Sequence, residues 1–484
     1  MHLSLLDVGS LLFAIHWLGL LAACHAVLKT RTSQGAIAWA VALGTMPYLT
    51  LIPYLFLGSS RFAGYIDARR IGNRFVRART ADSASQRWRQ RADGEGAQYP
   101  PRGLPAGAGT MPATLERLCG MPVQAGNQVR TLVDGSATFE AIFEAIAAAR
   151  DYVIVQFFII RDDALGARLR QLLCERAAAG VRVHLLYDGI GSHDLPHRYV
   201  NALRAGGVEV QKFATGRFIN RFQLNFRNHR KLVVVDGARA FVGGHNVGVE
   251  YLGQKPPLAP WRDTHIEVRG PAVSCIQFTF LEDWYWATQR VAELAPPADV
   301  AGAMHCQVIA TGPADAQETC SLFFVEAINA ARKRLWITTP YFVPDEAVFA
   351  ALRLAAMRGV DVRIMLPARR DHLVVFAAST LYAHDAIRAG VRVFRFLPGF
   401  LHQKVLLIDD LAAAVGSPNL DNRSFRLNFE LTVLTYDRCF AEEVAGMLNA
   451  DFQHCAEVDL GEFRRKPLWQ RAAMHLARLF APIL

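Results

Sequence analysis

The chain has 484 residues, 52% of them hydrophobic, with a formal net charge of +10 and a pI near 9.3. This length exceeds one typical hydrophobic core, so the sequence predicts two or three domains. The positive charge predicts an anionic partner, either nucleic acid or an acidic membrane surface. The eight cysteines show neither a CxxC pattern nor a Cys/His ligand spacing, which argues against a zinc site and against a disulfide scaffold.

Two long stretches at the N-terminus carry no charged side chain. No Asp, Glu, Lys or Arg lies between Asp7 and Lys29, and none lies between Arg31 and Arg61. Each stretch exceeds the roughly 20 residues that a helix needs to cross the hydrocarbon core. We therefore predict two membrane-spanning helices within residues 1–60, joined as a hairpin. Two prolines in the second helix are expected to kink it.

A basic juxtamembrane segment and linker follow at residues 61–115. Arginines stand at positions 61, 69, 70, 74, 77 and 79, whereas the hairpin loop carries only Lys29 and Arg31. By the positive-inside rule, the remainder of the chain lies on the cytoplasmic side. The same arginines favour contact with an anionic membrane surface.

From residue 116 onward the sequence alternates strand and helix patterns. Residues 152–160 form a nearly unbroken apolar run, typical of a strand buried on both faces. Residues 165–173 then place leucines at helical spacing, and residues 181–187 read as the next strand. This order of elements predicts an α/β layered fold.

The second half of the chain repeats the first. Residues 335–343 correspond to 152–160, and residues 359–363 correspond to 180–184. We therefore predict a duplicated domain, at residues 116–300 and 301–484, with a pseudo-twofold axis that brings corresponding segments to one cleft. A basic amphipathic segment at the C-terminus is expected either on the membrane surface or docked on the second domain.

Each half contains one copy of the motif HxKxxxxD. The copies are His229, Lys231 and Asp236 in the first half, and His402, Lys404 and Asp409 in the second. Each motif heads an apolar strand pattern, so the His and the Lys are expected on one face and the Asp at the far end, as a brace for the strand. Two accidental copies of this spacing are improbable, and the motifs predict one composite catalytic site.

A small-residue segment with an Asn follows each motif. The segments end in Asn246 in the first half, and in Ser417, Pro418 and Asn419 in the second. If a turn carries each segment back beside its motif, Asn246, Asn419 and Ser417 join the lysines as ligands for phosphoryl oxygens.

Two histidines at such a site provide nucleophilic and acid–base chemistry. One neutral imidazole attacks phosphorus, and the other, protonated, gives its proton to the departing alkoxide. Asp263 and Glu430 are the candidates that fix the imidazole tautomers, with Asp263 expected to orient His229. Lysines neutralise the phosphate charge in this scheme, so it calls for no metal or other cofactor.

These residues resemble the phospholipase D superfamily, whose hallmark is the paired HxKxxxxD motif. The similarity covers the chain from about Cys119 onward, and it is closer to the bacterial cardiolipin synthases. The segments that carry the closer similarity are Gly243–Gly253, Trp261–Thr264, Thr339–Asp345 and Asn419–Glu430. His245 departs from this family, in which a hydrophobic residue is expected. The resemblance implies two phospholipase D-like α/β/α domains with pseudo-twofold symmetry, preceded by the transmembrane helical hairpin.

The resemblance also implies a phosphatidyl transfer in a bacterial inner membrane. One phosphatidylglycerol would pass its phosphatidyl group to His229, in the first motif, and a second phosphatidylglycerol would accept it to form cardiolipin. Hydrolysis by water, as in a phospholipase D, and phosphatidylethanolamine as the donor are the alternatives. The expected partners are thus membrane phospholipids and an anionic membrane surface. A nuclease of the same superfamily would suit the positive charge, but two membrane spans argue against nucleic acid.

Overall fold

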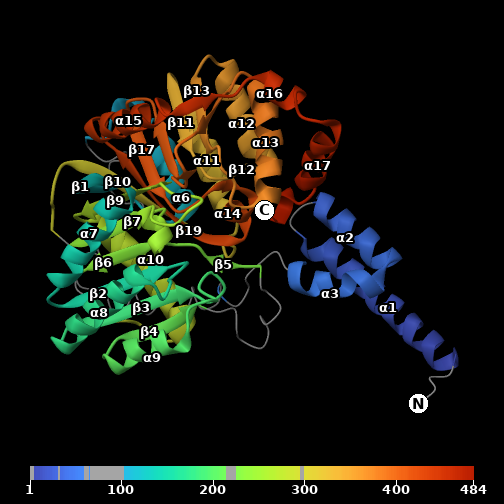
Figure 1. The fold of residues 1–484 in the computed structure, drawn as a ribbon, viewed down its shortest axis with the longest axis horizontal. Coiled ribbons are helices and arrows are strands. Elements are labelled where there is room, and N and C mark those ends of the chain that lie inside the picture. The colour runs from blue at the N-terminus through green and yellow to red at the C-terminus, as the bar shows by residue number, and fades with distance from the viewer. Residues whose placement is uncertain are drawn as a thin grey trace, which may run out of the picture.

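The computed structural model describes residues 5–30, 33–58, 65, 103–213, 225–294 and 299–483. Most of the basic segment predicted at residues 61–115 lies outside the described residues. Figure 1 shows a large α/β body with the N-terminal helices projecting from one side of it.

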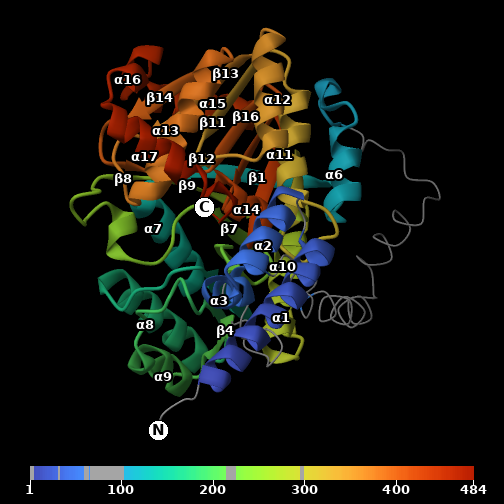
Figure 2. The ribbon, with the colours of Figure 1, turned by 90° about the vertical axis from the view of Figure 1, so that its right-hand side faces the viewer.

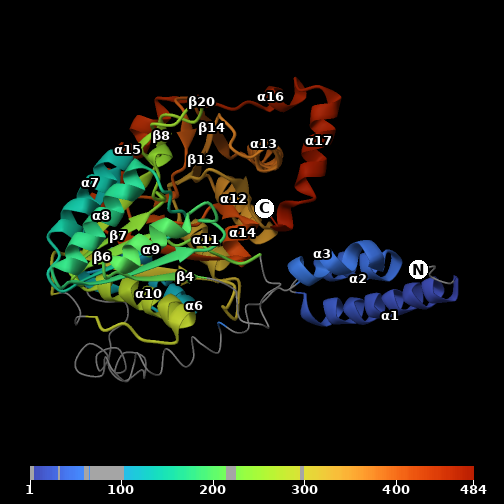
Figure 3. The ribbon, with the colours of Figure 1, turned by 60° about the horizontal axis from the view of Figure 1, so that its bottom comes forward.

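The N-terminal helices pack on one another (Figure 3). They are α1 (Leu5–Lys29), α2 (Ser33–Thr45) and α3 (Pro47–Leu57). Within the described residues one helix, Gly9–Lys29 of α1, is long and apolar enough to cross a membrane.

The second predicted span comprises two helices, α2 and α3, which are separated at Met46 just before Pro47. Pro47 starts α3, because proline suits the first turn of a helix and disfavours helical backbone at the residue before it. Pro53 lies inside α3. At about 1.5 Å per residue, neither α2 nor α3 alone reaches across a hydrocarbon core of about 30 Å. A second crossing by residues 33–57 therefore stays a prediction.

The body is built from two similar sets of strands. The first half contributes β1 (Gln124–Val133), β2 (Tyr152–Phe157), β3 (Arg182–Asp188), β4 (Glu209–Phe213), β5 (Arg227–Asn228), β6 (Leu232–Val235), β7 (Arg239–Gly243), β8 (Trp261–Arg262) and β9 (Thr264–Arg269). The second half contributes β10 (Met304–Thr311), β11 (Arg334–Thr338), β12 (Phe342–Val343), β13 (Asp361–Pro367), β14 (Arg392–Phe396), β15 (Phe400–Leu401), β16 (Val405–Ile408), β17 (Ala412–Gly416), β18 (Leu420–Asp421), β19 (Asn428–Tyr436) and β20 (Cys455–Glu457).

Most of these strands join in one sheet. Its order is β20-β14-β13-β11-β16-β17-β19-β10-β1-β9-β7-β6-β2-β3-β4, and β5 pairs with β19 off this path. Strands β1 and β10 pair antiparallel at the centre, and on either side the strands follow in corresponding order. The predicted duplication is thus visible as a pseudo-twofold arrangement. The two half-sheets meet through hydrogen bonds, so the halves form one continuous body.

Helices cover both faces of the sheet. They are α6 (Met111–Cys119), α7 (Asp134–Ala147), α8 (Ala164–Ala178), α9 (His197–Ala205), α10 (Ala272–Thr288), α11 (Thr319–Ala330), α12 (Glu346–Met357), α13 (Leu373–Arg388), α14 (Asn422–Arg426), α15 (Arg438–Phe452), α16 (Leu460–Arg464) and α17 (Leu468–Arg478). Figure 2 shows α7, α8 and α9 around the first half and α11, α12 and α13 around the second.

The apolar run of β2 shows why its strand is buried on both faces. Val153, Val155 and Phe157 belong to the core that includes residues of α7 and α8. Tyr152 and Ile154, which alternate with them, belong to the core that includes residues of α10. Since side chains of a strand point alternately to opposite faces, a strand between two helical layers needs an apolar residue at nearly every position.

Candidate active site

Two short parallel strand pairs bring the halves together at the motifs. Strand β5 pairs with β19 so that Asn228 lies opposite Phe429, and β15 pairs with β8 so that Leu401 lies opposite Arg262. The residues that follow these partners are His229 with Glu430, and His402 with Asp263. Each histidine therefore comes from one half of the chain and meets an acid from the other half.

The two histidine–carboxylate contacts are short and buried. The Nδ1 atom of His229 lies 2.9 Å from Oε2 of Glu430, and Nδ1 of His402 lies 2.7 Å from Oδ2 of Asp263. The carboxylate fixes the Nδ1–H tautomer in each ring and leaves Nε2 as the reactive nitrogen. The expectation that Asp263 orients His229 names the wrong partner, because the parallel pairing crosses between the halves.

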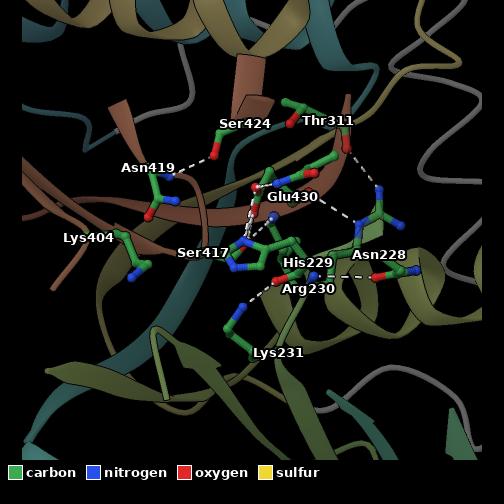
Figure 4. A network of polar contacts seen from close by, with 12 residues as sticks. Asn228, His229, Arg230, Lys231, Thr311, Lys404, Ser417, Asn419, Ser424 and Glu430 are labelled. Atoms are coloured by element: carbon green, nitrogen blue, oxygen red, sulfur yellow. Dashed lines mark hydrogen bonds and ion pairs between the residues drawn. The ribbon is translucent and has the colours of Figure 1, made fainter. Parts of the chain in front are cut away.

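Each motif lysine folds back on the histidine of its own motif. Nζ of Lys231 donates a hydrogen bond to the carbonyl oxygen of His229 at 2.7 Å, and Nζ of Lys404 donates to that of His402 at 2.5 Å. The His-x-Lys residues precede strands β6 and β16, whereas the sequence pattern placed them at the head of these strands. Figure 4 shows the His229 ring joined to Glu430, with Lys231 and Lys404 from the two halves close by.

Burial and the nearby lysine charges favour neutral bases at this site. Burial lowers the pKa of His229 to about 4, with Glu430 opposing the shift and Lys231 adding to it. Burial, Lys404 and Lys231 lower the pKa of His402. Both imidazoles are therefore neutral near pH 7 before an anionic substrate enters, as a nucleophile requires.

The lysines themselves titrate near neutral pH. Burial lowers the pKa of Lys231 to about 7, against the effect of Glu430 and together with that of Lys404. Burial lowers the pKa of Lys404 to about 8, against the effects of Asp263 and Glu430. A phosphate that entered between them would favour their charged forms, because an opposite charge nearby raises the pKa of an ammonium group.

Glu430 is held as an anion by its surroundings. Burial alone would raise its pKa, but His229, Lys231 and the Ser417 hydroxyl outweigh this effect and hold the pKa at about 2. Oγ of Ser417 donates to Oε2 of Glu430, and Nδ2 of Asn428 donates to Oε1 at 3.0 Å. Ser417, predicted as a substrate ligand, thus holds the carboxylate in this structure.

The two predicted asparagine ligands are engaged differently. Asn246 accepts from the backbone N–H of Ile159 at 3.1 Å and donates to the hydroxyl of Tyr251 at 2.9 Å, so both ends of its amide hold protein groups. Asn419 donates to Asp421 at 3.2 Å, and its Oδ1 is buried without a hydrogen-bond partner among the described residues. A substrate-binding role for Asn419 stays a prediction.

Asp236 and Asp409 lie at the far ends of β6 and β16. The Asp236 carboxylate accepts from the backbone N–H groups of residues 150, 151 and 152, at 2.8–2.9 Å. The Asp409 carboxylate accepts from those of residues 332, 333 and 334, at 2.7–2.9 Å. Both residues have φ near +51°. Each therefore braces the start of the neighbouring strand, as the sequence predicted, and a catalytic part for either residue stays a prediction.

A buried carboxylate behind each motif escaped the sequence analysis. Asp283 on α10 accepts from Gln156, Asn228, Arg230 and the hydroxyl of Tyr65, at 2.6–2.8 Å. Asn228 and Arg230 flank His229, so this cluster fixes the backbone that carries the ring. The signal available was an acidic pair in the otherwise apolar stretch of α10.

The second half has a corresponding carboxylate on α15. Asp451 accepts two hydrogen bonds from Arg262, at 2.7 Å each, and one from Gln403 at 2.9 Å. Gln403 lies between His402 and Lys404, as Arg230 lies between His229 and Lys231.

A second pair of histidines lies behind the first half of the site. Nδ1 of His245 and Nδ1 of His265 are 3.0 Å apart, and both rings are buried. Burial lowers both pKa values to about 3. The corresponding positions in the second half are Pro418 and Thr432, so this pair breaks the symmetry.

Among the residues that the structure describes, no group of three or more His, Cys, Asp or Glu side chains is arranged to hold a metal ion. The lysines and histidines of the two motifs are the groups available for phosphate.

Paired HxKxxxxD motifs in a duplicated α/β body are the hallmark of the phospholipase D superfamily. A family model described as "Cardiolipin synthase, PLD-like domain" matches residues 142–255 and 324–455. The chain belongs to the cardiolipin synthase family.

Similar proteins cover nearly the whole chain. It is 60% identical to cardiolipin synthase A of Pseudomonas aeruginosa (strain PAO1) over 480 residues, which cover 99% of this chain and 96% of that protein. It is 58% identical to cardiolipin synthase A of Pseudomonas fluorescens (strain Pf-5), with 98% of each chain covered. The fold is also similar to the crystal structure of phosphatidylserine synthase from Haemophilus influenzae, with a TM-score of 0.61 and 16% identity over 78% of this chain and 100% of that chain.

Proposed function

We propose that the protein is a phosphatidyltransferase that makes cardiolipin from two phosphatidylglycerol molecules and releases glycerol. The observation that carries this proposal is the pair of neutral histidines, each held by a carboxylate of the other half and flanked by the two motif lysines. The 60% identity to a cardiolipin synthase A over nearly the full chain supports cardiolipin as the product.

In the first step Nε2 of His229 attacks the phosphorus of one phosphatidylglycerol. The bond from phosphorus to the glycerol oxygen breaks, and His402 gives that oxygen a proton. His402 receives its proton when the anionic substrate enters, since the phosphate charge raises the pKa of a nearby imidazole. Lys231 and Lys404 bind the non-bridging oxygens, and Glu430 balances the positive charge on the phosphorylated ring.

In the second step a hydroxyl group of another phosphatidylglycerol attacks the same phosphorus. His402, now neutral, takes the hydroxyl proton, and the bond between phosphorus and Nε2 of His229 breaks. The products are cardiolipin and the enzyme with His229 free and His402 protonated, and His402 loses this proton when cardiolipin leaves. Ser417 acts in this scheme through Glu430, and Asn419 is the proposed additional ligand of the substrate.

The proposal includes the arrangement of the chain at a membrane. Residues 1–60 anchor it in a bacterial inner membrane by two crossings, residues 61–115 form a basic linker, and domains at 116–300 and 301–484 lie on the cytoplasmic side. The length and apolar character of α1 support one crossing. Both proposed substrates are bilayer lipids, so an anchored enzyme meets them at high effective concentration.

The test is turnover of labelled phosphatidylglycerol by the full chain in vesicles. Cardiolipin and free glycerol in equal amounts are the expected products of the native chain. His229→Ala and His402→Ala should each abolish both products, whereas His193→Ala, an exposed matched control, should not change them. Appreciable cardiolipin from either motif variant would contradict the two-histidine mechanism.

The same assay separates the alternatives. Phosphatidic acid as the main product would indicate hydrolysis. A second run with labelled phosphatidylethanolamine and unlabelled phosphatidylglycerol tests the donor: label in cardiolipin would show that phosphatidylethanolamine donates its phosphatidyl group.

A further inference from the structure

The C-terminal helix α17 is fixed to the body along one face. Met474 and Ala477 are buried, and Met474 packs with Leu381 of α13 and Phe463. Arg478 forms an ion pair with Asp385 of α13 at 2.9 Å. An isolated helix of 11 residues is marginal in water, so docking on α13 is what holds α17 in place.

The opposite face of α17 is apolar and faces solvent. At helical spacing along this face, and continuing just past the end of the helix, are Leu468, Trp469, Ala472, Leu476, Leu479 and Phe480. Leu468 is 78% exposed and Trp469 is 70% exposed. Contiguous exposed apolar surface of this kind marks an interaction site, because exposure to water is unfavourable.

Basic residues border this apolar face. Arg464, Arg465 and Lys466 come directly before α17, and Arg464 and Arg465 are exposed. Arg471 lies within the helix, with its guanidinium over the ring of Phe463. An apolar stripe with Trp, Phe and Leu, bordered by Lys and Arg, is the composition of helices that lie in the interface of an anionic bilayer.

The start of α13 extends the same surface toward the catalytic site. Leu373 and Val374 are exposed. Two residues before them, Asp371 accepts a hydrogen bond from the hydroxyl of Tyr341 and acts electrostatically on Lys404. The exposed apolar start of α13 therefore lies close to the site, and α17 packs along the same helix.

The N-terminal helices indicate what covers this surface. Figures 1 and 3 both show α17 on the side of the body from which α1, α2 and α3 project. Tyr65 lies only seven positions after Gly58, at the end of α3, and is buried against Phe213, Trp286 and Phe429. Seven residues span at most about 25 Å, so the membrane anchor ends near the body.

We propose that the outward face of α17, together with the start of α13, lies in the interface of an anionic phospholipid bilayer and seats the catalytic body on the membrane. The proposal rests on the proposed function for its choice of a lipid surface. The sequence left two alternatives for the C-terminal segment, a place on the membrane surface or docking on the second domain. In this proposal both apply, because one face of the helix docks on the protein and the other contacts lipid. The surface is separate from the catalytic residues and from the transmembrane anchor.

The first experiment places a photoreactive benzoylphenylalanine at position 469 of the full chain in vesicles of phosphatidylglycerol and phosphatidylethanolamine. Illumination should link position 469 to lipid. The same probe at position 198, an exposed residue of α9, should give at least about tenfold less lipid adduct. Equal adducts at both positions, or a protein in place of lipid at position 469, would overturn the proposal. The adduct does not depend on turnover, so it stands apart from the proposed reaction.

The second experiment uses the double variant Trp469→Glu/Leu476→Glu, with Val300→Glu as a control at another exposed apolar residue. On vesicles, KM for bulk lipid should rise at least about tenfold in the double variant and stay unchanged in the control. With substrate dispersed in detergent micelles, kcat and the thermal unfolding temperature should match the native chain. Unchanged KM on vesicles would refute the lipid contact, and loss of turnover in micelles as well would assign the residues to folding instead. If the native chain releases phosphatidic acid while these results hold, only the proposed function fails.

Discussion

The two halves of the site have the same backbone arrangement, but the residues around their histidines differ. His229 meets Glu430, which also accepts from Ser417 and Asn428, whereas His402 meets Asp263. Glu430 is one methylene group longer than Asp263, and the residue that faces each carboxylate differs accordingly. Gly244 occupies the position of Ser417, and a Cβ atom there would lie 2.1 Å from Oδ1 of Asp263. The shorter acid thus requires glycine, and the longer one leaves room for a hydroxyl donor.

The surroundings of the two rings differ as well. His402 lies among aromatic rings, with centroids at 5.0 Å from Trp261, 6.1 Å from Phe400 and 6.2 Å from Tyr251. The described aromatic neighbour of His229 is Phe158, at 5.0 Å. A ring that becomes permanently charged through a covalent bond is better stabilised beside the anchored anion Glu430. A symmetrical fold can therefore assign unequal roles to its two histidines, and we expect His229 to be the nucleophile.

The largest test of this difference removes each acid in turn. Glu430→Gln and Asp263→Asn should each lower kcat by roughly 10³–10⁴, because an amide no longer selects the reactive tautomer. In rapid-quench measurements with labelled lipid, Glu430→Gln should in addition prevent the acid-labile phosphatidyl adduct on the protein. Glu267→Gln, a buried acid bound by three arginines, is the matched control and should change stability rather than turnover. Native turnover in either site variant would contradict the cross-domain pairs.

The next test concerns the two motif lysines. Their surroundings are more alike than those of the histidines, because each lysine donates to the carbonyl oxygen of its own motif histidine. Lys231→Met and Lys404→Met should each lower kcat by roughly 10²–10³, the effect of removing one donor to a developing negative charge. Lys255→Met, a surface lysine, should leave turnover unchanged.

The lysines also predict a pH dependence. Their pKa values of about 7 and about 8 mean that the free enzyme loses both charges as pH rises through this range. The value of kcat/KM should therefore fall on the alkaline side, and kcat, which reports the complex with the phosphodiester, should fall at higher pH. Coincident profiles for kcat and kcat/KM would argue against a lysine contact with phosphate.

The sequence was sufficient to predict the duplicated α/β fold, the paired motifs and the two acids near the histidines. Each of these leaves a local or repeated pattern, such as the apolar run of β2 or the fixed HxKxxxxD spacing. The sequence did not predict which histidine each acid contacts, because no local or repeated pattern indicates it. The contact depends on β5 and β8, strands of two residues each, which are too short for a periodic pattern and which pair with segments about 140–200 positions away. The cluster around Asp283 is likewise assembled from distant segments.

A smaller effect is expected where the two halves differ at Gly244 and Ser417. Ser417→Ala removes one hydrogen bond to Glu430 and should raise the pKa of that carboxyl, with a loss of about tenfold or less in kcat. Gly244→Ala introduces a Cβ atom against Asp263 and should displace the carboxylate from His402, with a larger loss than Ser417→Ala. The measurement is kcat of each variant, together with a thermal unfolding temperature that should match that of the native chain. Equal losses would mean that the two positions do not differ in packing.

The smallest expected effect concerns a difference between the hydrogen-bond clusters around Asp283 and Asp451. Asp283 receives its fourth donor from Tyr65, near the membrane anchor, whereas Asp451 is bound by Arg262 and Gln403 from within the body. Tyr65→Phe keeps the ring packing and removes one hydrogen bond to a buried charge, so it should lower the free energy of unfolding by about 1.5–3 kcal/mol. Because Asp283 also holds Asn228 and Arg230 beside His229, the same variant should slow formation of the His229 adduct more than it weakens lipid binding. Unchanged stability together with an unchanged rate of adduct formation would show that Tyr65 fills space without supporting the first half of the site.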